Sequence, residues 1–136
     1  MIGLLLMAVK AKAKAKKKKK NIDKILLDLW AEAVKIRAGY KCEHCGNLKT
    51  LNSHHIFSKR HRATRWDIDN GICLCSGCHT LRTFSAHQSP AFIDWIEQYI
   101  GEERYNRIKE KAYQIKKWTE AEKEEIKVSL EEYIEG

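Results

Sequence analysis

The sequence contains little that would place it in a membrane or in an oxidising compartment. Its apolar opening, residues 1–9, is too short to span a bilayer, which needs about 20 apolar residues. The lysines follow this opening, whereas a secretory signal has its positive charge first. Five cysteines cannot all pair, and four of them form two CxxC pairs instead of a disulfide framework. We therefore expect a protein of the reducing cytoplasm with no membrane partner.

Acidic residues are missing from residues 1–20, which contain eight Lys. The charge of this segment therefore equals the net charge of the whole chain, +8. Like charges at this density repel one another, so we expect a flexible Lys-rich arm. Its role is left open between nonspecific phosphate contact and a solubilising terminus. Residues 41–87 have seven basic and three acidic side chains, and residues 88–136 have eight basic and twelve acidic. The basic excess suggests a face that meets a polyanion, the alternative being a solvated face without a partner.

A length of 136 residues fits one domain, in which we expect helices around a central segment without helical periodicity. Apolar residues at three- and four-residue steps predict a helix over 21–38, which Gly39 ends. The central segment is expected to form a strand through 53–57, a turn at Asn70-Gly71, a strand over 71–74 and a helix over 79–84.

The rest of the chain reads as helices, and we expect residues 101–136 to extend a domain formed by residues 21–100. Thr119 and Glu122 have the spacing of a capping box, in which each side chain bonds the backbone of the other. The predicted helices lie over 90–100, where Ser89-Pro90 gives the start, over 102–117 and from residue 119 onward.

Four cysteines lie in two CxxC turns that enclose a long interval, residues 46–74. Zinc binds four thiolates in a tetrahedron, and each CxxC turn supplies two of them from one bend. The interval is longer than the simplest zinc-ribbon spacing, so it should hold something else as well. Cys73 lies between two apolar residues and is expected to be buried as a small apolar side chain. The predicted ligands of one structural zinc ion are Cys42, Cys45, Cys75 and Cys78.

Histidines and one asparagine lie inside this interval or directly after it. His54 and His55 are adjacent on the expected strand, so one can face a metal while the other faces a substrate. His79 follows the second cysteine turn, and Asn70 lies in a turn where its amide can bond an imidazole or the backbone. Two lone histidines are interpreted as surface residues: His44 and His61.

The order His54-His55, Asn70, His79, framed by the two cysteine pairs, resembles the HNH endonuclease family. The similarity covers about residues 40–100 and is closest to the small HNH proteins of phages and prophages. The resemblance implies an α+β fold: a small ββα-metal HNH core with a four-cysteine zinc clamp, flanked by an N-terminal helix and C-terminal helices.

The resemblance also implies a role for each matching position. His55 would be the general base that activates water, and Asn70 would orient this base or brace its loop. His54 and His79 would be ligands of one catalytic divalent ion, Mg²⁺, Mn²⁺ or a similar metal. Many relatives have a further ligand four residues after the position of His79. This chain has Thr83 there, so His87 is the candidate for the further ligand.

The expected activity is metal-dependent hydrolysis of DNA phosphodiester bonds. Arg60, Arg62 and Arg65 are candidate phosphate contacts because guanidinium groups bind phosphate bidentately, although a solvated loop is the alternative. Phage packaging proteins and a second copy of the chain are further candidate partners. The alternative function is a catalytically silent, zinc-stabilised module that binds nucleic acid or protein, and the alternative substrate is RNA.

Overall fold

The computed structural model describes residues 21–136, and the arm predicted over residues 1–20 lies outside them. The described chain contains helices and one two-stranded antiparallel sheet, which confirms the α+β class. Over this part of the chain, no helix is both long enough and apolar enough to cross a bilayer.

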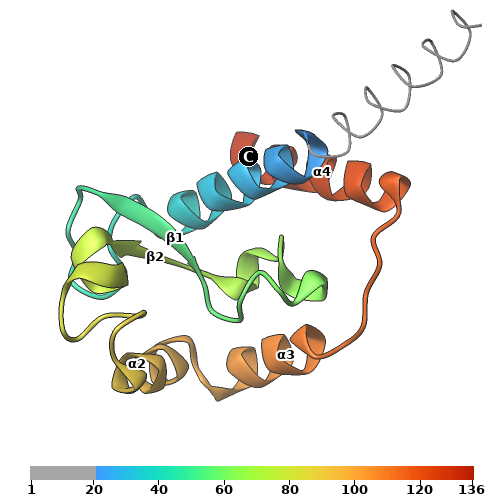
Figure 1. Ribbon diagram of the computed structural model, residues 1–136. Coiled ribbons are helices and arrows are strands. Elements are labelled where there is room, and N and C mark those ends of the chain that lie inside the picture. The colour runs from blue at the N-terminus through green and yellow to red at the C-terminus, as the bar shows by residue number, and fades with distance from the viewer. Residues whose placement is uncertain (1–20) are drawn as a thin grey trace, which may run out of the picture.

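The sheet lies between two pairs of helices (Figure 1). On one side, the helix over residues 21–37, here called the leading helix, runs beside α4 (Glu120–Glu135). On the other side, α2 (Pro90–Ile100) is followed directly by α3 (Glu102–Ala112). The segments between the cysteine turns are therefore enclosed by helices that come from both ends of the described chain.

Strands β1 (Leu51–His55) and β2 (Gly71–Cys75) pair in the antiparallel direction. The register places Leu51 opposite Cys75 and His55 opposite Gly71. Both strands agree with the prediction in kind, although β1 begins and ends earlier than the expected 53–57. Both adjacent histidines belong to the paired part of the strand, as predicted.

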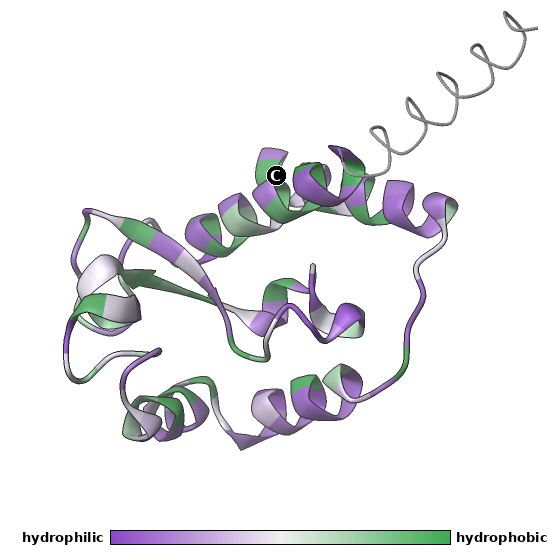
Figure 2. Ribbon diagram, in the orientation of Figure 1, coloured by the Kyte–Doolittle hydropathy of each residue, from purple (hydrophilic) through white to green (hydrophobic). Residues whose placement is uncertain are grey.

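Two hydrophobic clusters form the core, one on each face of the sheet. Strand β2 is buried along its whole length, and Figure 2 shows it as an almost continuous hydrophobic strand. Ile72 and Leu74 join the cluster that contains α2, while Cys73 joins the cluster that contains the leading helix. The predicted burial of Cys73 is confirmed. Leu130 of α4 belongs to the same second cluster, so the acidic C-terminal helix packs on the core.

The segment after the second cysteine turn differs from the prediction. Instead of a helix over 79–84, the chain forms a five-residue π-helical turn, η3 (Gly77–Leu81), and then folds back. The fold-back is held by the His87 N–H, which donates to the His79 carbonyl (3.1 Å). Because the chain folds back here and does not continue as a helix, His87 lies beside His79.

Helix α3 ends at Ala112 and not at residue 117 as predicted. Residues 113–119, here called the connector, form a turn followed by a segment without regular secondary structure. The Trp118 Nε1–H donates to the Arg62 carbonyl (2.8 Å). Ile115, which lies within the predicted helix over 102–117, is fully exposed. Tertiary contact therefore overrides the helical periodicity of this stretch.

Local signals predicted the starts of the last helices more closely. The Thr119 hydroxyl accepts from the Glu122 N–H (3.1 Å), and the Glu122 carboxylate accepts from the Thr119 N–H (3.0 Å). This confirms the capping box at the start of α4. Ser89 occupies the predicted position before α2, but its side chain makes no capping hydrogen bond.

Gly71 marks the closest approach of the sheet to the leading helix. A Cβ at this position would lie 2.3 Å from Val34 Cγ2 and 2.9 Å from Trp30 Cζ2. Its φ of −118° suits any residue, so the requirement for glycine is steric. We expect Gly71→Ala to lower the free energy of unfolding by about 1–3 kcal/mol, as measured by chemical denaturation.

Val34→Ala is the matched second change, because it removes the γ-carbons that a methyl group on residue 71 would meet. The double variant should lose less stability than the two single variants added together. A loss equal to their sum would show that contact with Val34 does not limit residue 71.

Candidate functional site

The four cysteines of the CxxC turns converge in one cluster. Their sulfur atoms all lie within 4.8 Å of one another, and the Cys45 and Cys75 sulfurs are 3.6 Å apart. Thiolates around a tetrahedral zinc ion with Zn–S bonds of about 2.3 Å would be about 3.8 Å apart. This spacing fits a zinc ion and is far too wide for a disulfide. The predicted set Cys42, Cys45, Cys75 and Cys78 can therefore hold zinc.

The first cysteine turn depends on Gly46. Its φ of 78° lies in the left-handed region that favours glycine, and its N–H donates to the Cys42 carbonyl (2.9 Å). A hydrogen bond from the backbone of Asn47 lowers the pKa of Cys45 to about 6. The thiolate is the form that binds zinc, so this turn presents a thiol that ionises readily near neutral pH.

The second cysteine turn places Cys78 in a buried position beside a cation. Burial raises the pKa of Cys78, which opposes ionisation, but the Arg82 guanidinium donates to its sulfur (3.5 Å). His44 Nδ1 lies 3.2 Å from the same sulfur, and its ring packs against Phe92 and Trp95. The interpretation of His44 as a surface residue is therefore wrong, because it forms part of the wall around the cysteine cluster.

Glu43, between the first two cysteines, joins the cluster to the rest of the fold. Its carboxylate accepts from the Cys73 N–H (2.7 Å) and from the Tyr99 hydroxyl (3.1 Å). The first cysteine turn is thus bonded to β2 and to α2. The sequence offered no signal for this role, because its two partners lie about 30 and 56 residues further along the chain.

Three of the predicted metal ligands form a second group, here called the histidine trio. His54, His79 and His87 each offer a ring nitrogen, and these nitrogens lie within 4.8 Å of one another. The Nε2 atoms of His79 and His87 are 3.0 Å apart, close to the roughly 3.3 Å between imidazoles on a tetrahedral metal. Three protein ligands leave a coordination position for water or substrate, so the trio fits an open metal site.

Burial keeps two members of the trio, His54 and His79, in the form that binds metal. It lowers the pKa of His54 to about 3, with smaller contributions from the charges of His79 and His87. The pKa of His79 is lowered by burial and then by the nearby His87. Neutral imidazoles are the required ligands, so little proton release from His54 and His79 opposes metal binding at neutral pH.

His55 points to the opposite face of β1, as the alternation of side chains predicted. Its ring stacks on Trp30, with centroids 3.8 Å apart and 11° between the planes, and its Nε2 lies 3.0 Å from the Arg65 carbonyl oxygen. Because a carbonyl only accepts, this bond places the proton on Nε2 and leaves Nδ1 able to accept one. Burial lowers the pKa of His55, and the Arg65 carbonyl opposes this shift.

Asn70 is fully buried and braces the loop after β1. Its Oδ1 accepts from the Phe57 N–H (2.8 Å), while its Nδ2 donates to the carbonyls of Phe57 (2.9 Å) and Thr64 (3.1 Å). Thr64 precedes the residue whose carbonyl holds the His55 ring. Of the two roles predicted for Asn70, these contacts support bracing of the loop.

The three predicted phosphate contacts lie on this loop in different surroundings. Arg60 and Arg62 are exposed. Arg65 is half-buried, its Nε donates to the Lys59 carbonyl (2.8 Å), and its guanidinium lies 5.8 Å from the Trp66 ring centroid. Arg65 is therefore held by contacts within the loop, whereas the exposed side chains of Arg60 and Arg62 are more accessible to a ligand.

His61 is the second histidine whose assignment to the surface is wrong. Its Nδ1 lies 3.1 Å from the Ala112 carbonyl oxygen, and its ring packs edge-on against Phe57 and Tyr113. It therefore joins the loop after β1 to the end of α3. The sequence gives no hint of this, because the two segments lie far apart along the chain.

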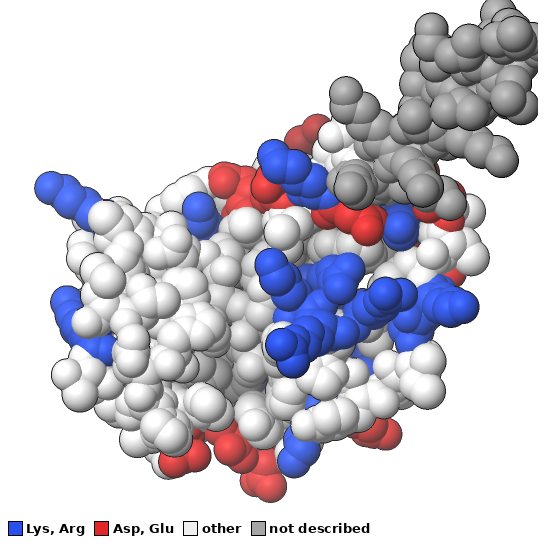
Figure 3. Space-filling view, viewed as in Figure 1, with Lys and Arg blue, Asp and Glu red and all other residues white. Residues whose placement is uncertain are grey.

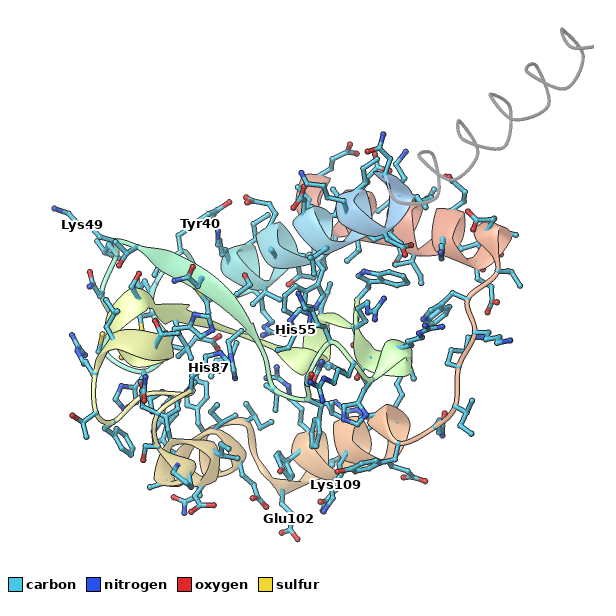
Figure 4. All side chains as sticks on the ribbon, in the orientation of Figure 1. Tyr40, Lys49, His55, His87, Glu102 and Lys109 are labelled. Atoms are coloured by element: carbon cyan, nitrogen blue, oxygen red, sulfur yellow. The ribbon has the colours of Figure 1, made fainter. Side chains whose placement is uncertain are left out.

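A cleft with a volume of about 660 Å³ contains the histidine trio and His55. Figure 4 shows His55 and His87 near the middle of the molecule, between the leading helix and α2. Trp30 lies on one wall, and Lys59 lines the edge formed by the loop after β1. Neither Trp30 nor Lys59 was singled out from the sequence, where Trp30 fits the apolar face of a helix.

Comparisons of the chain with protein-family models, with curated proteins and with solved structures found no match.

The cysteine cluster predicts a structural zinc ion, which spectroscopy can separate from any metal on the histidine trio. Substitution with Co²⁺ should give thiolate-to-metal absorption bands, because sulfur ligands occur in this cluster alone among the described residues. Cys75→Ser should remove these bands and unfold the domain, since metal binding and folding are linked. Cys73→Ala is the control and should keep both the bands and the fold. A stably folded protein with no bound metal would contradict the assignment.

Proposed function

We propose that the chain is a metal-dependent endonuclease of the HNH type that hydrolyses phosphodiester bonds in DNA. The observation that carries the proposal is the meeting of a neutral histidine base and a three-imidazole metal group in one cleft. Adjacent residues supply them, because His54 belongs to the trio and His55 is the base. The antiparallel strands followed by the helical turn η3 are in keeping with a ββα-metal core.

His55 acts as the general base that takes a proton from the attacking water. The Trp30 ring and the Arg65 carbonyl fix the orientation of its imidazole, with Nδ1 as the acceptor. A neutral imidazole is suited to this task because its ordinary pKa of about 6.5 lies near working pH. Asn70 serves as a positioning residue, since it holds the loop that supplies the carbonyl.

The histidine trio holds the catalytic divalent ion. When bound, such an ion stabilises the charge that grows on the phosphoryl oxygens and on the leaving 3′ oxygen. Arg60, Arg62 and the remaining donors of Arg65 contact neighbouring phosphates and orient the DNA backbone. The four-cysteine cluster is closed by four protein ligands and has a structural role only.

A catalytically silent binding module would also use the cysteine cluster. It would have no need for a histidine with a fixed acceptor nitrogen beside three metal ligands that leave a coordination position open. The arrangement of His55 and the trio therefore favours the nuclease.

Plasmid nicking tests the base. His55→Ala should reduce the rate by about 10²–10⁴-fold, the usual contribution of a general base. His61→Ala is a matched control, because this ring lies on the neighbouring loop and bonds the end of α3 instead of lining the cleft. A parent protein that leaves plasmid intact with every divalent metal tried would contradict the nuclease, and equal cutting by parent and His55→Ala would contradict the base.

The chemistry of the trio makes a separate prediction about the metal. Imidazole ligands suit Mn²⁺ less well than Ni²⁺ or Zn²⁺, and they suit Mg²⁺ least, because Mg²⁺ prefers oxygen. We expect half-maximal nicking at a lower concentration of Ni²⁺ or Mn²⁺ than of Mg²⁺. His87→Ala should raise these concentrations by about 10–100-fold, the range found even for residues that only orient ligands.

Gln88→Ala is the matched control for His87→Ala, since Gln88 is exposed, adjacent and outside the trio. The ligand assignment fails if His87→Ala and Gln88→Ala require the same metal concentration as the parent. Half-maximal nicking at a lower concentration of Mg²⁺ than of Mn²⁺ would show that oxygen ligands, and not the imidazoles, dominate the site.

A further inference from the structure

Two segments that are far apart in the sequence lie side by side on the surface next to the cleft. These are the loop over residues 58–66 and the connector over residues 113–119. The Trp118 Nε1–H donates to the Arg62 carbonyl (2.8 Å), and the rings of Trp118 and Trp66 have centroids 6.1 Å apart. These contacts fix the connector against the loop, so their side chains present one continuous surface.

This surface carries positive charge only. Figure 3 shows Lys and Arg gathered densely on this face of the molecule. Neither segment contains an acidic residue. Lys116 pairs with Glu122 (2.6 Å), and the other cations make no ion pair within residues 21–136. The six cations, here called the basic band, are Lys59, Arg60, Arg62, Arg65, Lys116 and Lys117.

The basic band begins at the cleft. Lys59 lines the cleft together with His54 and His55. Arg60 and Arg62 on the same loop are exposed, and so is Lys117 on the connector that packs against this loop. A row of unpaired cations raises the local concentration of a polyanion and guides it along the surface.

We propose that the basic band binds the phosphate backbone of duplex DNA where the duplex leaves the cleft, and that the connector is part of this substrate site. The inference rests on the proposed function, because a phosphodiester held at the trio continues on both sides into flanking phosphates. Contacts of Lys and Arg with phosphate oxygens position the duplex and carry no sequence information directly. The band therefore strengthens binding to DNA of any sequence.

The test is the double variant Arg62→Ala/Lys117→Ala in the full chain. Both side chains are exposed, and the Trp118 hydrogen bond uses the backbone of Arg62, so the fold should persist. Binding to a labelled duplex of random sequence is measured over a range of salt concentrations, without added divalent metal. We expect the dissociation constant to rise about tenfold or more and the salt slope to fall by about 2, roughly 0.9 for each lost phosphate contact.

Lys49→Ala/Lys109→Ala is the matched control, since it removes the same charge from exposed sites elsewhere on the surface (Figure 4). Residues 1–20 are present in every protein compared, so their contribution to the slope cancels. Equal slopes for the two double variants would overturn the proposal. An equal loss of affinity for polyglutamate would also overturn it, because the band would then attract acidic polymers in general.

Cleavage by the same proteins separates the two proposals. If the parent cuts plasmid while Arg62→Ala/Lys117→Ala binds DNA as the parent does, the basic band is wrong and the nuclease stands. If the parent does not cut but the double variant binds less tightly and with a smaller salt slope, the nuclease is wrong and the band stands as a DNA-binding surface.

Discussion

The convergence of four thiol groups is the constraint on which the rest of the structure depends. It joins the turn before β1 to the end of β2, where Leu51 lies opposite Cys75, and so closes the interval that carries the site. A small domain with a modest core gains much from such a staple. It also fixes the site directly, because His79 follows Cys78 in the chain. Any loosening of the cluster would therefore move a ligand of the histidine trio.

The position of His55, the proposed base, depends on a second set of contacts that the cysteines do not make. Trp30 packs on one face of the His55 ring, and the Arg65 carbonyl holds one edge. Asn70 holds Thr64 beside that carbonyl, and Gly71 lets Trp30 come close to the sheet. Asn70, a candidate catalytic residue in the sequence, thus contacts the backbone of the loop after β1 and not the His55 ring. The leading helix is consequently part of the site, and not only a flank of it.

The sequence was sufficient where one local signal decided the structure. The capping box at Thr119, the convergence of the two CxxC turns and the alternation that separates His54 from His55 are examples. It failed where distant segments compete for the same residues. The end of α3 and the position of His61 follow from packing against the loop after β1, and periodicity contains no information about that loop. The stacking of Trp30 on His55 could not be predicted for the same reason.

The turn η3 shows how the fold separates two groups of potential metal ligands although Cys78 of one group and His79 of the other are adjacent in the chain. A regular helix from His79 would carry residue 83 to the ligand position, and this chain has a threonine there. The π-helical turn and the fold-back bring His87 to His79 instead, while Cys78 stays buried among sulfur atoms. Thiolates and imidazoles favour different metals, so neighbouring residues can serve a closed site and an open one. The irregular turn thus brings His87, the candidate named in place of a ligand at residue 83, beside the other two histidines of the trio.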